Sequence, residues 1–254
     1  MTLQFDRNTQ YLAAGMRHGE IKIYNLNYGE VETCIDQVDE NQKGVLDTGL
    51  IDIKYPITNL KWKPISGISR NSNWLTASYG NGTIKLWDIS SKRAVHTIIE
   101  EGNPGVYTID YNVLGNLLVS GGADATIRVY DDKTTKLVKE YKPGLNGIVH
   151  HFNRIHCVKF NQEDDRIIYS GGADKVVTIH DTRWKDPVAN IVGPYIIGDS
   201  IDINNNSLLT GSYRSKDCLE IWDLRTFDRT YVYNWIKEYP KRGGQVVSAK
   251  LRAD

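Results

Sequence analysis

One twelve-residue segment recurs along the chain, and it constrains the fold more than any other feature. Ser120–Asp131 (SGGADATIRVYD) is typical of a hairpin, because a strand ends in small residues, a Gly/Ala/Asp turn follows, and a second strand alternates before an aspartate. The pattern returns at Ala14–Asn25, Ala77–Asp88, Ser170–Asp181 and, with a longer turn, Thr210–Asp223. Five copies of one hairpin predict a repeat architecture.

The spacing of the hairpins gives the size of the repeated unit. The residue before the closing acid or amide is Tyr24, Trp87, Tyr130, His180 or Trp222, at successive intervals of 63, 43, 50 and 42 residues. A period of about 40–45 residues is typical of propeller blades that have four strands each. The sequence therefore predicts an all-β propeller of about five four-stranded blades, with insertions in the longer intervals.

Two of the five hairpins end in the dipeptide Trp-Asp, at Trp87 and at Trp222. With five such hairpins in phase, the sequence resembles the WD-repeat (WD40) β-propeller family over nearly its whole length. The resemblance implies a single propeller domain over residues 1–254. The blades are expected at approximately 1–36, 57–99, 105–141, 154–192 and 195–235.

Two segments fall outside these blades. Residues 37–56 begin polar and then become apolar, which predicts an inserted loop or, alternatively, a loop with one extra strand. Residues 245–251 have the apolar pattern of a first, innermost strand and predict the start of a sixth blade. We therefore expect the ring to be incomplete, completed by missing sequence or by a partner, or left open.

Composition argues against several classes of partner. The chain has 31 Lys plus Arg and 31 Asp plus Glu, so its formal net charge is zero, and the basic residues are dispersed. Such a chain has no field to attract nucleic acid or an anionic membrane. Three cysteines without paired spacing favour a reducing compartment, and neither a signal peptide nor an apolar run of about 20 residues is present. We expect a cytoplasmic protein that binds no nucleic acid and no membrane.

In WD-repeat proteins a hydrogen-bond relay joins a histidine before the first strand, a Ser or Thr in the second, an Asp in the turn and the Trp of the third. The fourth repeat is similar in its first three members, but it has His180 at the tryptophan position. The other repeats are more degraded, so the relay is expected only in the fourth. The resemblance implies structural roles for His151, Ser170, Asp174, Ser120, Asp124, Trp87 and Trp222.

A set of Ser, His and Asp resembles a hydrolase triad. Here we expect it to satisfy buried polar groups, because an unpaired buried donor costs on the order of 1–3 kcal/mol. His150, His151 and His156 are the one plausible metal constellation, but no closely spaced cysteine pair completes four ligands. The sequence therefore predicts no catalytic residue, no metal and no cofactor, with a propeller-fold hydrolase or metal-dependent enzyme as the alternative.

Loops on a rigid scaffold commonly carry recognition, and Tyr and Arg are frequent at interface hot spots. We therefore predict partner contacts at turn residues that are larger or more polar than a turn requires, and at aromatic residues on the blade rim. The alternative is that these side chains are only solvated. The predicted residues are Arg17, His18, Tyr79, Tyr213, Arg214 and Lys216 in turns, and Trp184 and Trp235 on the rim beside Tyr231 and Tyr233.

The expected function is a non-catalytic protein–protein interaction scaffold, a subunit of a larger intracellular hetero-complex. The segment from Gly193 to Arg214 is similar to a subgroup of WD-repeat proteins associated with protists and ciliated cells. That resemblance implies a cytoskeletal or ciliary assembly.

Overall fold

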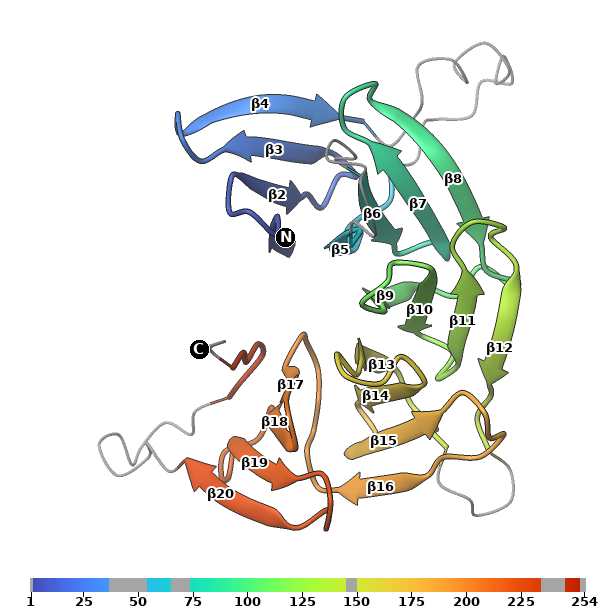
Figure 1. Ribbon diagram of the computed structural model, residues 1–254, viewed down its shortest axis with the longest axis vertical. Coiled ribbons are helices and arrows are strands. Elements are labelled where there is room, and N and C mark those ends of the chain that lie inside the picture. The colour runs from blue at the N-terminus through green and yellow to red at the C-terminus, as the bar shows by residue number, and fades with distance from the viewer. Residues whose placement is uncertain (1, 37–53, 65–73, 145–149, 234–244, 252–254) are drawn as a thin grey trace. The chain divides into compact units, whose positions relative to one another are not determined.

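The computed structural model describes residues 2–36, 54–64, 74–144, 150–233 and 245–251. Strands are the regular elements of these residues, and they form five four-stranded antiparallel sheets (Figure 1). Each sheet is a meander of four consecutive strands, as a propeller blade requires. The predicted all-β class with five blades is confirmed. Within the described ranges, no helix is long and apolar enough to cross a membrane.

The sheets are called blades one to five in chain order. Blade one has β1 (Thr2–Phe5), β2 (Tyr11–Gly15), β3 (Ile21–Asn25) and β4 (Glu30–Ile35). Blade two has β5 (Ile57–Trp62), β6 (Trp74–Tyr79), β7 (Thr83–Asp88) and β8 (Arg93–Ile99). Blade three has β9 (Val106–Tyr111), β10 (Leu117–Gly122), β11 (Ile127–Asp131) and β12 (Leu137–Tyr141).

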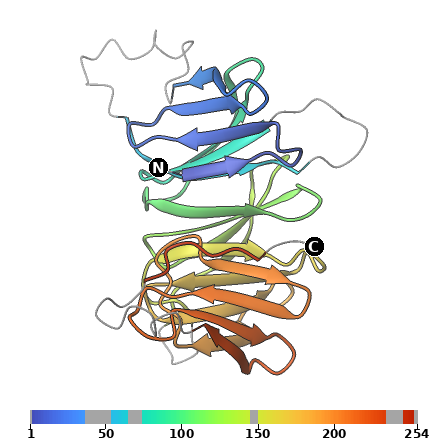
Figure 2. The same cartoon turned by 90° about the vertical axis from the view of Figure 1, so that its left-hand side faces the viewer.

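Blade four has β13 (Ile155–Phe160), β14 (Ile167–Gly172), β15 (Val176–Asp181) and β16 (Ala189–Val192). Blade five has β17 (Ile201–Asn204), β18 (Ser207–Gly211), β19 (Leu219–Asp223) and β20 (Arg229–Tyr233). Figure 2 shows the alternating strand directions in blade one (blue) and blade five (orange to red).

The chain divides into two compact units, Met1–Tyr107 and Thr108–Asp254. Blades one and two belong to the first unit, and blades four and five belong to the second, with β9 of blade three crossing the boundary. The single ring and its incompleteness stay predictions. Most of the predicted insertion, residues 37–53, lies outside the described residues.

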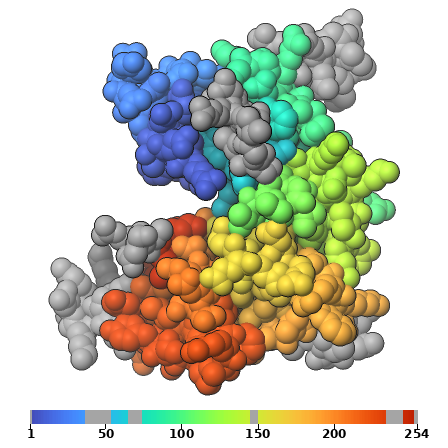
Figure 3. Space-filling view, viewed as in Figure 1, coloured from blue at the N-terminus to red at the C-terminus, as the bar shows by residue number. Residues whose placement is uncertain are grey.

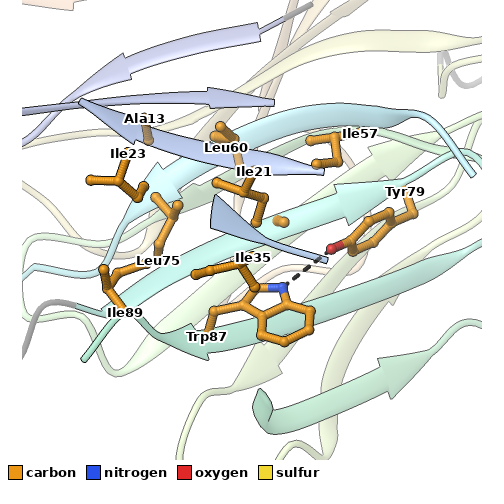
Figure 4. Packing of buried hydrophobic residues seen from close by; sticks show 11 residues of the cluster. Ala13, Ile21, Ile23, Ile35, Ile57, Leu60, Leu75, Tyr79, Trp87 and Ile89 are labelled. Carbon is orange, nitrogen blue, oxygen red and sulfur yellow. Dashed lines mark hydrogen bonds between the residues drawn. The ribbon is translucent and has the colours of Figure 1, made fainter. Parts of the chain in front are cut away.

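In the first unit the core lies between the sheets of blades one and two (Figure 4). Blade one contributes Ala13, Ile21 and Ile23, while blade two contributes Leu75 and Trp87, and all five are at most 1% exposed. An apolar layer between two sheets is the main stabilising term, at about 25 cal/mol per Å² of buried apolar surface.

The second unit repeats this arrangement twice. One cluster of buried residues joins blades three and four, including Val119, Val129 and Val158, and another joins blades four and five, including Val177 and Ile201. Blade four is therefore covered on both faces, and all six residues of β15 are buried. Because both faces are covered, this strand buries the polar side chains of Thr178, His180 and Asp181 as well as its apolar ones.

Successive sheets meet at a repeated backbone junction. The N–H of Ile57 donates to the C=O of Met16 at 3.2 Å, and the N–H of Ile196 donates to the C=O of Gly172 at 3.1 Å. The N–H of Val246 donates to the C=O of Ser212 at 3.2 Å in the same way. Residues 245–251 thus take the place of a first strand after blade five.

Two sequence-based expectations about first strands are wrong in detail. Residues 245–251 form no strand, because a first strand needs a second one to pair with and no described residue supplies it. Blade five was expected from about residue 195, but its first strand begins at Ile201. The chain bends before it, where the N–H of Ser200 donates to the C=O of Gly198 at 2.8 Å. A Cβ on Gly198 would strike the backbone of Val247, so the two segments approach closely there.

Candidate functional site

The relay predicted for blade four is present. Nδ1 of His151 lies 2.6 Å from Oδ2 of Asp174, and its Nε2 lies 2.8 Å from Oγ of Ser170. The histidine comes from the loop before β13, the serine from β14 and the aspartate from the turn between β14 and β15. The predicted structural roles of these three residues fit this geometry.

This set fixes the turns of blade four and has no access to a substrate. Besides His151, the carboxylate of Asp174 accepts hydrogen bonds from the N–H of Phe152 at 3.2 Å and of Val176 at 3.3 Å. The side chains of His151 and Asp174 are 1% and 0% exposed. A nucleophile and its base must reach a substrate to act, whereas these groups only satisfy one another.

His180 occupies the tryptophan position and makes no equivalent bond. It is buried, and neither ring nitrogen has a hydrogen-bond partner among the described residues. Burial, reinforced by repulsion from His151 and His150, lowers the pKa of His180 to about 3. In blade five, by contrast, Nε1 of Trp222 donates to Oγ1 of Thr210 at 2.9 Å. An imidazole is shorter than an indole, so His180 does not replace that bond.

Blades two and three satisfy the same positions differently. In blade three, Asp124 pairs with Nη2 of Arg128 at 2.6 Å, in place of a histidine, while Ser120 is fully buried. In blade two, Nε1 of Trp87 donates to the hydroxyl of Tyr79 at 3.2 Å (Figure 4). Outside blade four, therefore, only some of the relay residues are present.

Two predicted partner-binding residues have internal roles. Tyr79 is 0% exposed, so its expected contact with a partner is wrong; its ring fills the core beside Trp87. Arg214 donates to the C=O of Asp217 at 2.7 Å and of Gly193 at 3.1 Å, and it pairs with the buried Glu220. A buried carboxylate needs a cation, which explains why this arginine turns inward.

The other predicted partner residues lie at the surface, and their partner contacts stay predictions. Arg17, Lys216 and Trp184 are exposed, the last at 64%. His18 is exposed and its hydrogen bond to Glu20, at 2.9 Å, lowers the pKa of that carboxyl group. Trp235 lies outside the described residues.

Successive turns of blades four and five are bonded into one continuous surface. The N–H of Ala173 donates to the C=O of Arg154 at 2.9 Å, and the N–H of Gly193 donates to the C=O of Lys175 at 2.8 Å. The N–H of Tyr213 donates to the C=O of Tyr195 at 2.8 Å. We call this the turn surface, and its side chains are those of Phe152, Arg154, Lys175, Tyr195, Tyr213 and Lys216.

Sequence reasoning found two residues of the turn surface, Tyr213 and Lys216. It missed the other four, which are Phe152, Arg154, Lys175 and Tyr195. Phe152 is 69% exposed although it follows the buried His151 directly. The available signal was an aromatic residue inside an otherwise polar loop, His-Phe-Asn-Arg. Blades four and five, yellow to red in Figure 3, form a continuous surface on the face shown.

The histidine cluster considered as a metal site is divided between separate environments. His151 belongs to the relay, and Nε2 of His150 lies 3.5 Å from Oδ1 of Asp186. Across the described parts of the chain, no group of three or more His, Cys, Asp and Glu side chains is placed to hold a metal ion. All three cysteines are free thiols, and burial raises the pKa of Cys157 to about 12.

Comparison with known proteins agrees with this architecture. The family model "WD domain, G-beta repeat" matches residues 55–88, 93–131 and 145–181. The chain is 28% identical to "THO complex subunit 6 homolog" of Danio rerio, over 88% of this chain and 68% of that protein. It is 26% identical to "Protein SPA1-RELATED 4" of Arabidopsis thaliana, over 87% of this chain. It is also 28% identical to "Ribosome biogenesis protein WDR12 homolog" of Culex quinquefasciatus, over 51% of this chain.

The chain spans about a quarter of the length of the Arabidopsis relative (25%) and 29% of the Culex relative. Matched repeats cover hairpins of blades two, three and four, and the five sheets have the four-stranded meander of a propeller blade. The chain therefore contains WD40 repeats in these three segments, and its sheets have the form of WD-repeat propeller blades.

Proposed function

We propose that this protein is a non-catalytic interaction scaffold and a subunit of a larger hetero-complex of proteins. Two of its relatives carry names that place them in assemblies or their construction, the THO complex and ribosome biogenesis. Those names describe the relatives, and they support an assembly role here without identifying the assembly.

One observation carries the proposal: aromatic side chains are displayed where they contribute nothing to the core. Phe152 is 69% exposed, Trp184 64% and Tyr231 53%. The polar groups of the relay, by contrast, are buried and bonded to one another. Exposed aromatic side chains on a rigid framework are suited to burial against a partner, because they lose little conformational entropy there.

The blade rim supplies a second set of such side chains. Tyr231 and Tyr233 lie on β20, the last strand of blade five, with ring centroids 4.8 Å apart in an edge-to-face pair. Trp184 lies in the turn between β15 and β16. We propose that the rim contacts partner proteins as well as the turn surface.

The finer proposal is a cytoplasmic complex of cytoskeletal or ciliary type. It rests on the resemblance of the segment from Gly193 to Arg214 to WD-repeat proteins of ciliated cells. Fluorescent tagging of the chain in its native cell tests this part, and enrichment in the nucleus would contradict it.

The main test is affinity purification with cross-linking mass spectrometry. We expect reproducible protein partners cross-linked near the turn surface or β20, and reduced recovery after replacing Trp184 and Tyr231 by alanine. Tyr28→Ala is a matched control, because Tyr28 is 80% exposed but lies in blade one. Absence of any partner, together with turnover of a generic ester or phosphate substrate, would favour the enzyme alternative.

A further inference from the structure

We propose that the turn surface of blades four and five binds an acidic peptide segment that carries a leucine or aromatic side chain. The proposal deepens the interaction function and rests on it. It concerns the residues defined above as the turn surface, all of which belong to the second compact unit.

The cations of the turn surface are available to a ligand. Arg154, Lys175 and Lys216 are exposed, and no described acidic side chain pairs with any of them. Three exposed cations at adjoining turns create a local positive potential in a chain whose net charge is zero.

The acidic side chains beside these turns already pair with other residues. Asp174 is held by His151, and Asp217 pairs with Arg229 at 3.2 Å. Glu220 is 1% exposed and pairs with Arg229 at 2.7 Å as well as with Arg214. The carboxylates that might neutralise the surface are therefore paired with other groups, and a negatively charged ligand would supply the missing counter-charges.

Phe152 provides an apolar anchor within the same surface. Its backbone N–H is fixed by Asp174 at 3.2 Å, while its ring is 69% exposed. Tyr195 and Tyr213 lie next along the surface, with ring centroids 6.3 Å apart in an edge-to-face arrangement. A ring presented on a fixed backbone loses little freedom on binding, so a leucine or aromatic side chain of a ligand can pack against it with a small entropic cost.

Lys175 is an exposed cation in a turn conformation that recurs along the chain. Its φ is 63°, in the left-handed region; the equivalent residue is Gly19 in blade one, Gly82 in blade two and Ala125, with a φ of 60°, in blade three. A lysine costs more than a glycine in this conformation. The turn nevertheless holds the lysine outward, with its C=O accepting a bond from Gly193.

These features favour a peptide over a nucleic acid. The affinity of a protein for nucleic acid comes largely from the phosphates that its Lys and Arg side chains neutralise. The turn surface offers three exposed cations, and the chain has no net positive charge to draw a polyanion from a distance. A short acidic peptide needs only two or three charge pairs, and its apolar residue has the Phe152 ring to pack on.

The experiment is selection from an unbiased, phage-displayed library of random twelve-residue peptides on the full chain. Enriched peptides are then synthesised with a fluorescent label and their affinities measured by anisotropy. The test variant is Lys175→Glu with Lys216→Glu, and a second variant is Phe152→Ser. Lys185→Glu is the control, since Lys185 is exposed at the opposite end of β15 from Lys175.

We expect the enriched peptides to be acidic and to contain a leucine or an aromatic residue. Their affinity should fall at least about tenfold in the double variant and about fivefold in Phe152→Ser, with little change in Lys185→Glu. Raising the salt concentration should weaken binding to the unmodified chain, a readout that does not depend on variants folding.

Three results would overturn the proposal: no enrichment, enriched peptides that are neutral or basic, or acidic peptides that bind the double variant as well as the unmodified chain. Tighter binding of a labelled twelve-nucleotide RNA than of any selected peptide would assign the surface to nucleic acid instead. If cross-linking finds protein partners only at the rim, the scaffold function stands and this inference fails.

Discussion

Blade two and blade four stabilise the same position of the repeat in opposite ways. Blade two places Trp87 there, 0% exposed, with its indole bonded to the hydroxyl of Tyr79. Blade four places His180 there, equally buried but without a bonded partner among the described residues, next to a complete His–Ser–Asp relay. One blade depends on apolar volume, and the other depends on a polar network.

The comparison teaches that the repeat pattern tolerates exchange of its stabilising groups. Removing buried volume leaves a cavity, whereas removing one member of a polar network leaves its partners buried and unsatisfied. The two blades should therefore respond differently to substitution and to pH.

The largest loss of stability is expected from substitution of Trp87. Replacing Trp87 by alanine removes the largest fully buried side chain of the first unit and leaves a cavity between blades one and two. The free energy of unfolding should fall by about 3–5 kcal/mol. Urea denaturation followed by far-ultraviolet circular dichroism measures this. Trp184→Ala, at a residue that is 64% exposed, should change stability little, and an equal loss in both variants would contradict a core role for Trp87.

The second largest loss of stability is expected from substitution of Asp174. Its replacement by alanine removes the acceptor of His151 and of the backbone N–H groups of Phe152 and Val176. We expect a loss of about 2–3 kcal/mol, because the donors of His151 and Val176 are buried and lose their acceptor. Asp228→Ala is the control at an exposed position in the same unit, and thermal unfolding of both variants makes the comparison.

Blade four also shows how much of the fold could be predicted from the sequence. The relay of blade four was implied by the resemblance to WD-repeat proteins, because His151, Ser170 and Asp174 occupy the matching positions of the repeat. The strands followed from alternation and turn residues, since both are local properties of the chain.

Tyr79 and Arg214 show why the direction of some side chains could not be predicted from the sequence. Tyr79 is the last residue of β6 and Arg214 lies in the turn after β18, and both were expected to face solvent. Tyr79 turns inward to meet the indole of Trp87, and Arg214 turns inward to neutralise the buried Glu220. Each direction depends on a residue of another strand, so local pattern alone does not determine it.

The blades should also differ in their dependence on pH. The pKa of His180 in the folded protein, about 3, lies below its ordinary value of 6.5. The stability associated with neutral His180 is thus complete above about pH 6.5 and is lost as the pH falls toward 3, at up to about 1.4 kcal/mol per pH unit. His180→Phe should flatten this part of the pH profile relative to the unmodified protein. Identical profiles between pH 6.5 and 4 would show that the unfolded and folded states bind this proton equally.

The smallest effect is expected from Tyr79→Phe, which removes one oxygen atom and keeps the ring that fills the core. The indole N–H of Trp87 then has no acceptor, and both side chains are 0% exposed. We expect a loss of about 1–2 kcal/mol, measured by urea denaturation, against no change in Tyr28→Phe at a residue that is 80% exposed. In a Trp87→Phe background the same substitution should cost much less, because no indole donor remains to be left unsatisfied. An undiminished cost there would mean that the Tyr79 hydroxyl acts through another partner, and that blade two contains a polar element of its own.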